Sequence, residues 1–231
     1  MRARMHGWSL VELLVVLSIT AILLGVLLPA LAASRQTAKQ VNCLANLRSL
    51  GQAHAVYLND SSGLMLGTTH STSWIEVLRG YDPAVLLRSP IDTSPHFAGG
   101  LPINGAYRQT SYSINRYLSP DFIDGASRIE TVPRPEATVH FGIKVFEQRP
   151  GDPSDDRPLW DHFHADGWSF GFNPPASNAS DEMQINAYRG DLTEDDAVSG
   201  YGYLDGHAEA QAFSGVYVDA ATNRFDYRVA R

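Results

Sequence analysis

The stretch GWSLVE at residues 7–12, with the run LLVVLSITAILLGVLLPALAA at residues 13–33 directly behind it, decides the architecture of this chain. No charged residue interrupts the second stretch. At 1.5 Å per residue, a helix over residues 13–33 would be about 30 Å long, which matches the hydrocarbon core of a bilayer. The sequence therefore predicts a membrane-spanning helix with a single carboxylate, that of Glu12, at its start.

A carboxylate near such a helix needs a partner, because inserting one at a membrane centre costs about 2.5–3.5 kcal/mol. Gly7, Trp8 and Glu12, preceded by the basic residues Arg2 and Arg4, resemble the leader of type IV pilins and type II secretion pseudopilins. In that family a short basic leader ends in Gly, an aromatic residue follows, and a Glu stands five positions after the cut. Trp8 replaces the usual Phe. The resemblance implies cleavage after Gly7 by prepilin peptidase, methylation of the Trp8 amine, and filament assembly that uses Glu12.

Two other interpretations of this segment stay open. It could be an ordinary single-pass anchor, with Glu12 reaching the cytoplasmic interface. It could also be a secretory signal peptide, since residues 30–32 (Ala-Leu-Ala) form a small-x-small cleavage site. Against the signal peptide, the uncharged run is longer than the usual apolar region, and an acid at its start is unexpected.

The orientation in the membrane depends on the resemblance more than on charge. Arg2 and Arg4 before the apolar run are matched by Arg35 and Lys39 just after it, so the positive-inside rule does not decide. The resemblance implies a single-pass inner-membrane protein with a cytoplasmic N-terminus and a periplasmic head, which later enters a filament in the periplasm or at the cell surface.

Composition limits the partners of the remaining chain. Of the 18 basic and 25 acidic residues, two and one lie within residues 1–33, which leaves 16 against 24 and a net charge of −8 outside the membrane. This balance argues against nucleic acid as a partner. The single cysteine, Cys43, excludes an intramolecular disulfide, although a bridge between chains stays open.

The membrane segment is expected to continue into an amphipathic helix. Residues 34–59 contain no Pro and one Gly, and their apolar residues recur at steps of three and four. They include Val41, Leu44, Leu47, Leu50 and Tyr57. We therefore predict one helix from about Ser9 to Leu58, with a kink or local unwinding at Pro29 and an end at the turn-forming residues 59–63.

The head should be an antiparallel sheet with long loops and a short helix around residues 74–78. Strand patterns cover residues 110–118 and 138–146, the second with Val139, Phe141, Ile143 and Val145 on one face. Residues 201–213 predict a hairpin whose Asp205-Gly206 pair favours a type I′ turn. The expected fold is α+β and pilin-like: a leader (1–7), a transmembrane half-helix (8–33), an amphipathic half-helix (34–60) packed on about four strands, and a globular head (61–231).

A second resemblance covers residues 43–51 together with Asp205-Gly206-His207. Both are similar to patterns in pseudopilin-like proteins that carry a prepilin-type cleavage and methylation domain. In that group a second Cys often stands at the position of Ser89, and a His at the position of Asp195, so the bridge is absent here and any function of that His is in doubt. We interpret Cys43 as a small buried residue and Asp205-Gly206 as a turn.

Two polar clusters are candidates for chemistry. Asp161, His162, His164 and Asp166 alternate over six residues and could bind a transition metal or serve hydrolysis. The alternative function for the chain is therefore a membrane-anchored periplasmic hydrolase or binding protein using His162 and His164. Ordinary solvated loop residues are the other interpretation of this cluster.

The second cluster consists of carboxylates alone, which offer the oxygen ligands that Ca²⁺ prefers. It comprises Asp191, Glu194, Asp195 and Asp196. EF-hand spacing is lacking, but major pseudopilins bind calcium in a C-terminal loop, so the resemblance implies Ca²⁺ as a candidate cofactor. A plain acidic loop is the alternative.

Together these patterns predict a non-enzymatic structural subunit of a pseudopilus or type IV pilus-like filament. Its expected partners are prepilin peptidase, other pilin or pseudopilin subunits and the inner membrane. We expect the filament to act in protein secretion or at the cell surface.

Overall fold

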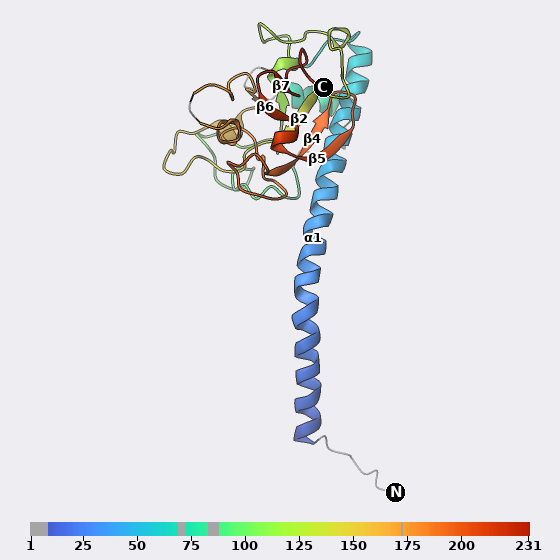
Figure 1. Ribbon diagram of the computed structural model, residues 1–231, viewed down its shortest axis with the longest axis vertical. Coiled ribbons are helices and arrows are strands. Elements are labelled where there is room, and N and C mark those ends of the chain that lie inside the picture. Colours follow the sequence, from blue (N-terminus) through green and yellow to red (C-terminus); the bar gives the residue numbers. More distant parts are fainter. Residues whose placement is uncertain (1–8, 69–72, 83–87, 172) are drawn as a thin grey trace. The chain divides into compact units, whose positions relative to one another are not determined.

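The computed structural model describes residues 9–68, 73–82, 88–171 and 173–231 (Figure 1). Gly7 and Trp8, together with Arg2 and Arg4, lie outside the described residues. The chain divides into two compact units, Met1–Lys39 and Gln40–Arg231. Each unit is described by itself.

Helix α1 (Leu10–Asp60) is a single 51-residue α-helix, which confirms the predicted span within two residues at either end. It continues through Pro29 as an α-helix, without the local unwinding that the proline predicted. At its C-terminus the Gly63 N–H donates to Leu58 O at 2.7 Å, and Ser62 has a φ of 55°. This pairing across a left-handed residue satisfies a terminal carbonyl of the helix, as in a Schellman motif.

The head contains a five-stranded sheet in the order β3-β1-β2-β4-β5. The strands are β1 (Tyr112–Asn115), β2 (Val139–Ile143), β3 (His162–Phe163), β4 (Val198–Tyr203) and β5 (Ala208–Ala212). The α+β fold is confirmed, but the sheet is mixed: β3, a two-residue edge strand, runs parallel to β1, while the other pairs are antiparallel.

Shorter elements complete the head. They are the α-helices α2 (Ser73–Tyr81) and α3 (Pro175–Ala179), the small antiparallel pair β6 (Tyr217–Asp219) and β7 (Thr222–Asn223), and the 3₁₀ turns Arg116–Leu118, Ile129–Thr131, Arg157–Leu159 and Phe213–Gly215. Helix α2 confirms the predicted helical patch around Trp74, whose side chain is 1% exposed.

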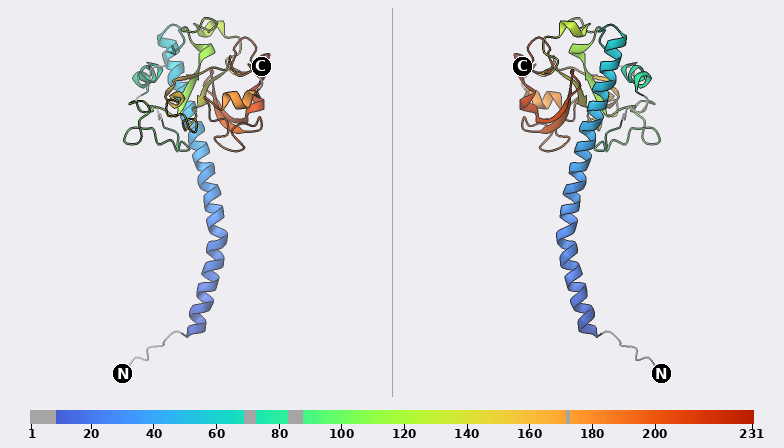
Figure 2. Two further views of the ribbon diagram at one scale, coloured as in Figure 1. Left: turned by 90° about the vertical axis from the view of Figure 1, so that its left-hand side faces the viewer. Right: turned by 90° about the vertical axis from the view of Figure 1, so that its right-hand side faces the viewer.

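The outer part of α1 packs on one face of the sheet. Figure 2 shows these turns, in cyan, beside the strands of the head. Cys43, Leu47 and Leu50 are fully buried against side chains of β1 and β2, namely Tyr112, Ile114, Phe141 and Ile143. Val41, which we placed on the same apolar stripe, is instead 60% exposed. The predicted packing of the long helix on the sheet is thus confirmed, with its buried stripe beginning at Cys43.

Glycines allow the close approach of helix and sheet. A Cβ built on Gly51 of α1 would lie 2.7 Å from the Cα of Gly206 in the β4–β5 turn. A Cβ on Gly202 of β4 would lie 3.6 Å from the Cβ of Leu47. The helix therefore lies almost directly on the backbone of the hairpin.

A bulge in β2 places two of its side chains on opposite faces of the sheet, contrary to the prediction. Val139 pairs with Tyr203 and Phe141 with Gly202, so β2 has one residue more than β4 between these pairs. Because a bulge shifts the alternation by one residue, Val139 packs with Tyr201 and Tyr203. Phe141 packs toward α1. The prediction that these two residues share a face is wrong.

The β4–β5 hairpin is confirmed, but its turn type is not. The Tyr203 N–H donates to His207 O, and the Gly206 N–H to Tyr203 O, which leaves a three-residue loop. Only Gly206 has a positive φ, of 94°, whereas a type I′ turn needs positive φ at Asp205 as well. The Asp205 carboxylate instead accepts from the His207 N–H at 3.0 Å, which stabilises an ordinary backbone conformation at Asp205.

Candidate functional site

Ser9 and Glu12 form a reciprocal cap at the start of α1. The Glu12 N–H donates to Ser9 Oγ at 3.2 Å, and the Ser9 N–H donates to Glu12 Oε2 at 2.8 Å. This is a capping box, in which two N–H groups that a helix start leaves unsatisfied gain partners. Sequence reasoning missed it, although the Ser-x-x-Glu spacing is the signal for such a box.

The capping box turns the Glu12 carboxylate back toward the N-terminal side of the helix. The bond from Ser9 uses one acceptor position on Oε2, whereas an ionised carboxylate offers about four. Glu12 is exposed. The carboxylate can therefore accept a further donor without losing its contact with Ser9.

Every large apolar side chain of α1 between Leu10 and Leu31 is between 42% and 80% exposed. The helix is long and apolar enough to cross a membrane. Burying one such Leu, Ile or Val side chain is worth about 1.5–3 kcal/mol, so this surface requires lipid or other apolar helices around it. By its length and its exposed apolar surface, the segment fits a membrane anchor.

The predicted calcium ligands are exposed and lie in the loop that precedes β4. The Glu194 N–H donates to Asp191 O at 3.3 Å, and the Ser214 N–H donates to Asp195 O at 2.9 Å, so backbone contacts fold this loop. Within the described ranges, which include Asp196, no three His, Cys, Asp or Glu side chains are arranged to hold a metal ion. Calcium binding here stays a prediction and would require the loop to gather its carboxylates.

The histidine cluster is assembled differently from its sequence pattern. His162 and His164 lie next to each other, with their Nε2 atoms 3.2 Å apart. Asp161 contacts His162 at 2.6 Å, and Glu182, from the segment after α3, contacts His164 at 3.1 Å. Asp166 does not join them in this chain of contacts but pairs with Arg116 at 2.5 Å. Glu182 is distant in sequence, so no local pattern could have identified it.

Cys43 is a free, fully buried thiol, as predicted. Its sulfur lies 3.9 Å from the Tyr112 hydroxyl, and the side chains of Ser89 and Tyr188 also contact it. The position where the resemblance places a second cysteine, Ser89, is thus beside Cys43. Burial raises the pKa of the Cys43 thiol, so the thiolate that disulfide exchange needs is disfavoured.

Two histidines are buried between α1 and β2. The rings of His54 and His140 lie 4.4 Å apart, and both side chains are at most 1% exposed. Burial lowers the pKa of His54 to about 3 and lowers that of His140 well below its ordinary value. Both imidazoles are therefore neutral in the folded protein near neutral pH.

The match to a known family lies in the N-terminal segment. The family model described as the prokaryotic N-terminal methylation motif matches residues 2–28. No curated protein and no solved structure matches the chain. The match covers Glu12 with its capping residue Ser9 and most of the exposed apolar surface of α1. Residues 2–28 thus carry the signature of the prepilin-type cleavage domain found in type IV pilins and pseudopilins.

Proposed function

We propose that the protein is a structural subunit of a pseudopilus or type IV pilus-like filament. It is made as a prepilin, cut after Gly7 by prepilin peptidase, methylated at the Trp8 amine and assembled from the inner membrane. One observation carries the proposal: the methylation motif of residues 2–28 coincides with a helix whose large apolar side chains are all exposed up to Leu31. A role in protein secretion or at the cell surface follows from the pilin and pseudopilin families.

The exposed surface of α1 supports assembly through helix packing. In the membrane, lipid covers the large apolar side chains from Leu10 to Leu31. When the subunit leaves the membrane for a filament, apolar surface of comparable area must replace the lipid, and the same helix of neighbouring subunits supplies it. The orientation in this proposal places the N-terminus in the cytoplasm and the head in the periplasm.

We assign to Glu12 the ion pair that joins neighbouring subunits. After cleavage the Trp8 amine is a cation in a medium where an unpaired charge is costly. The Glu12 carboxylate of a neighbouring subunit can accept that amine while its own Ser9 N–H stays bonded at 2.8 Å. The pairing would fix one axial step between neighbours.

Ser9 provides a control that separates this role from helix capping. Ser9→Ala removes the side chain of the cap, which costs about 1 kcal/mol of helix stability, but keeps the carboxylate. Glu12→Val removes the carboxylate and one half of the same box. Both variants should insert in the membrane and be cut after Gly7.

The experiment expresses wild type, Ser9→Ala and Glu12→Val with their assembly machinery and measures the subunit in sheared filaments. We expect Ser9→Ala to assemble nearly as wild type and Glu12→Val to fail. Equal incorporation of Glu12→Val and wild type would overturn the pairing. An equal defect in both variants would assign Glu12 to capping alone.

The hydrolase alternative has one supporting observation, the contact between His162 and His164. It has less support than the filament, because the motif at residues 2–28 is typical of a family of structural subunits that are generally non-enzymatic. An activity lost on substitution of both histidines, with filament incorporation intact, would favour the enzyme.

A further inference from the structure

The two imidazoles at the edge strand β3 face each other through one particular pair of atoms. The Nε2 atoms of His162 and His164 are 3.2 Å apart, and the ring centroids are 4.6 Å apart with the planes inclined by 61°. His162 is 2% exposed and His164 17% exposed at their side chains. The pair lies in the head, far in sequence from the methylation motif.

The other ring nitrogens determine the tautomers. His162 Nδ1 lies 2.6 Å from Asp161 Oδ1, and His164 Nδ1 lies 3.1 Å from Glu182 Oε1. An ionised carboxylate only accepts hydrogen bonds, so each Nδ1 carries the hydrogen and donates it. In a neutral imidazole the Nε2 atom then holds a lone pair. The two Nε2 lone pairs then lie 3.2 Å apart, and a proton or a metal ion between them would remove their repulsion.

The separation and the carboxylates together fit a metal ion. At a metal–nitrogen distance of 2.0–2.1 Å and a tetrahedral angle, two nitrogen ligands stand about 3.3 Å apart, close to the 3.2 Å observed. Carboxylates that accept from the opposite ring nitrogen are the usual support of metal-binding histidines, because they fix the tautomer and the ring orientation. Imidazole nitrogens favour Zn²⁺ and its neighbours over Mg²⁺ or Ca²⁺.

We propose that His162 and His164 bind a divalent transition-metal ion of the Zn²⁺ class through their Nε2 atoms. Asp161 and Glu182 are positioning residues that hold the two rings. Among the described residues no group of three or more His, Cys, Asp or Glu is arranged to hold a metal ion, so we assign the remaining coordination positions to water.

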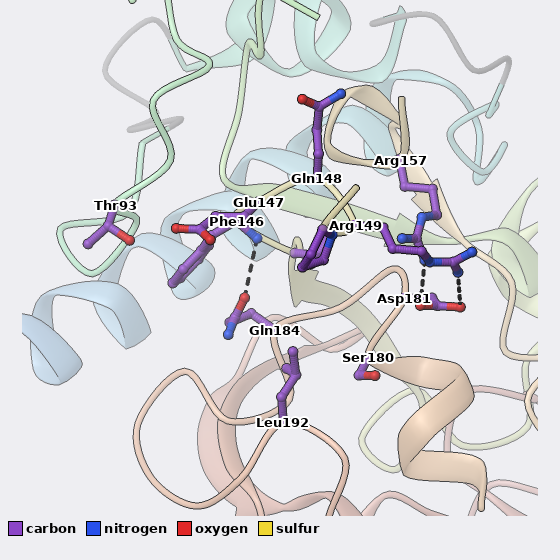
Figure 3. Close-up of a pocket in the computed structure, with 12 residues that line it drawn as sticks. Thr93, Phe146, Glu147, Gln148, Arg149, Arg157, Ser180, Asp181, Gln184 and Leu192 are labelled. Atoms are coloured by element: carbon purple, nitrogen blue, oxygen red, sulfur yellow. Dashed lines mark hydrogen bonds and ion pairs between the residues drawn. The ribbon is translucent and has the colours of Figure 1, made fainter. Parts of the chain in front are cut away.

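Access and local charge agree with a cation at this place. A cavity of about 300 Å³ opens beside His164 and Glu182, and Trp160, Arg149 and Arg157 also line it. Both arginines bond to Asp181, at 2.7 and 2.6 Å. Figure 3, a close-up of another pocket that these three residues also line, marks the two contacts with dashed lines. Arg157 also contacts Asp155 at 2.6 Å. Their charges are therefore offset by carboxylates of their own.

Titration calorimetry of the full chain in detergent micelles with ZnCl₂ tests the proposal. We expect one Zn²⁺ per chain for wild type and no heat of binding with MgCl₂. His164→Gln should weaken Zn²⁺ binding at least 100-fold, because it removes one of two protein ligands. Glu182→Gln should weaken it by about 10–100-fold, the usual effect of losing a carboxylate that orients a ligand.

His207→Gln is the matched control. His207 also has a carboxylate on its Nδ1, Asp205 at 2.6 Å, but its ring stacks on Tyr203 instead of facing another imidazole. It should bind Zn²⁺ like wild type. Circular dichroism without metal checks that each variant folds, and if His164→Gln does not fold, Glu182→Gln decides.

Two results would overturn the proposal. One is wild-type binding no stronger than that of micelles alone, which would assign the space between the rings to a shared proton. The other is unchanged binding in folded His164→Gln or Glu182→Gln.

Discussion

Replacing Gly51 by Ala tests how closely α1 lies on the β4–β5 hairpin. The added Cβ would be 2.7 Å from Gly206 Cα and 3.1 Å from Gly206 O, whereas ordinary contact begins at 3.4 Å. Both opposing atoms are backbone, so no side chain can rotate away. Overpacking of this kind costs about 1–3 kcal/mol, and we expect the upper end of that range. Ala gains about 1 kcal/mol over Gly in helix propensity, so the net loss is about 1–2 kcal/mol.

Thermal unfolding of the full chain in detergent, followed by circular dichroism, measures this loss. For a unit of this size, 1 kcal/mol corresponds to about 2–4 °C in Tm, so Gly51→Ala should lower Tm by about 2–8 °C. Gly80→Ala in α2 is the matched control, because a Cβ there meets nothing within 4 Å; it should leave Tm unchanged or raise it slightly. A Tm for Gly51→Ala at or above wild type would refute the close approach.

Two further predictions concern protons and calcium. The folded pKa of His54, about 3, lies below its ordinary 6.5, so below pH 6.5 the unfolded chain binds a proton that the folded chain excludes. The free energy of unfolding should therefore decrease as the pH is lowered, by about 2 kcal/mol at about pH 5 from His54 alone. Urea unfolding should show a smaller decrease in His54→Gln than in wild type, and equal decreases would contradict the assignment. Millimolar Ca²⁺ should raise the Tm of wild type by mass action but not that of Asp195→Asn, and no shift in wild type would leave residues 191–196 as a solvated loop.

The long helix could be predicted closely because its signals are local. An uninterrupted apolar run, a three-and-four periodicity and the turn formers at residues 59–63 together predict α1 within two residues. The same local reading found the β4–β5 hairpin. It failed at the turn type, because the Asp205 side chain bonds the His207 N–H and stabilises a negative φ that the Asp-Gly pair alone does not indicate.

Features decided by tertiary contacts could not be predicted. Strand β3 is two residues long and exists because it pairs with β1. The bulge near His140 reverses the facing of Val139 relative to Phe141, and no periodicity reveals where an extra residue is inserted.

The candidate sites likewise include one with a local sequence signal and one that only tertiary contacts create. The capping box of Ser9 and Glu12 has a visible spacing and was overlooked, whereas the contact between His164 and Glu182 joins residues 18 positions apart through the fold. The proximity of Ser89 to Cys43 was anticipated from a family pattern and not from the residues themselves.

The mature N-terminus is the most direct test of the filament assignment. Intact-mass and N-terminal peptide mass spectrometry of the protein, isolated from cells that contain prepilin peptidase, would identify the first residue and its modification. We expect a chain that begins at Trp8 with one methyl group on its amine, and a Gly7→Leu variant that stays uncut. A mature chain that begins at Ala33, or one that retains residues 1–7 in the presence of the peptidase, would contradict the account.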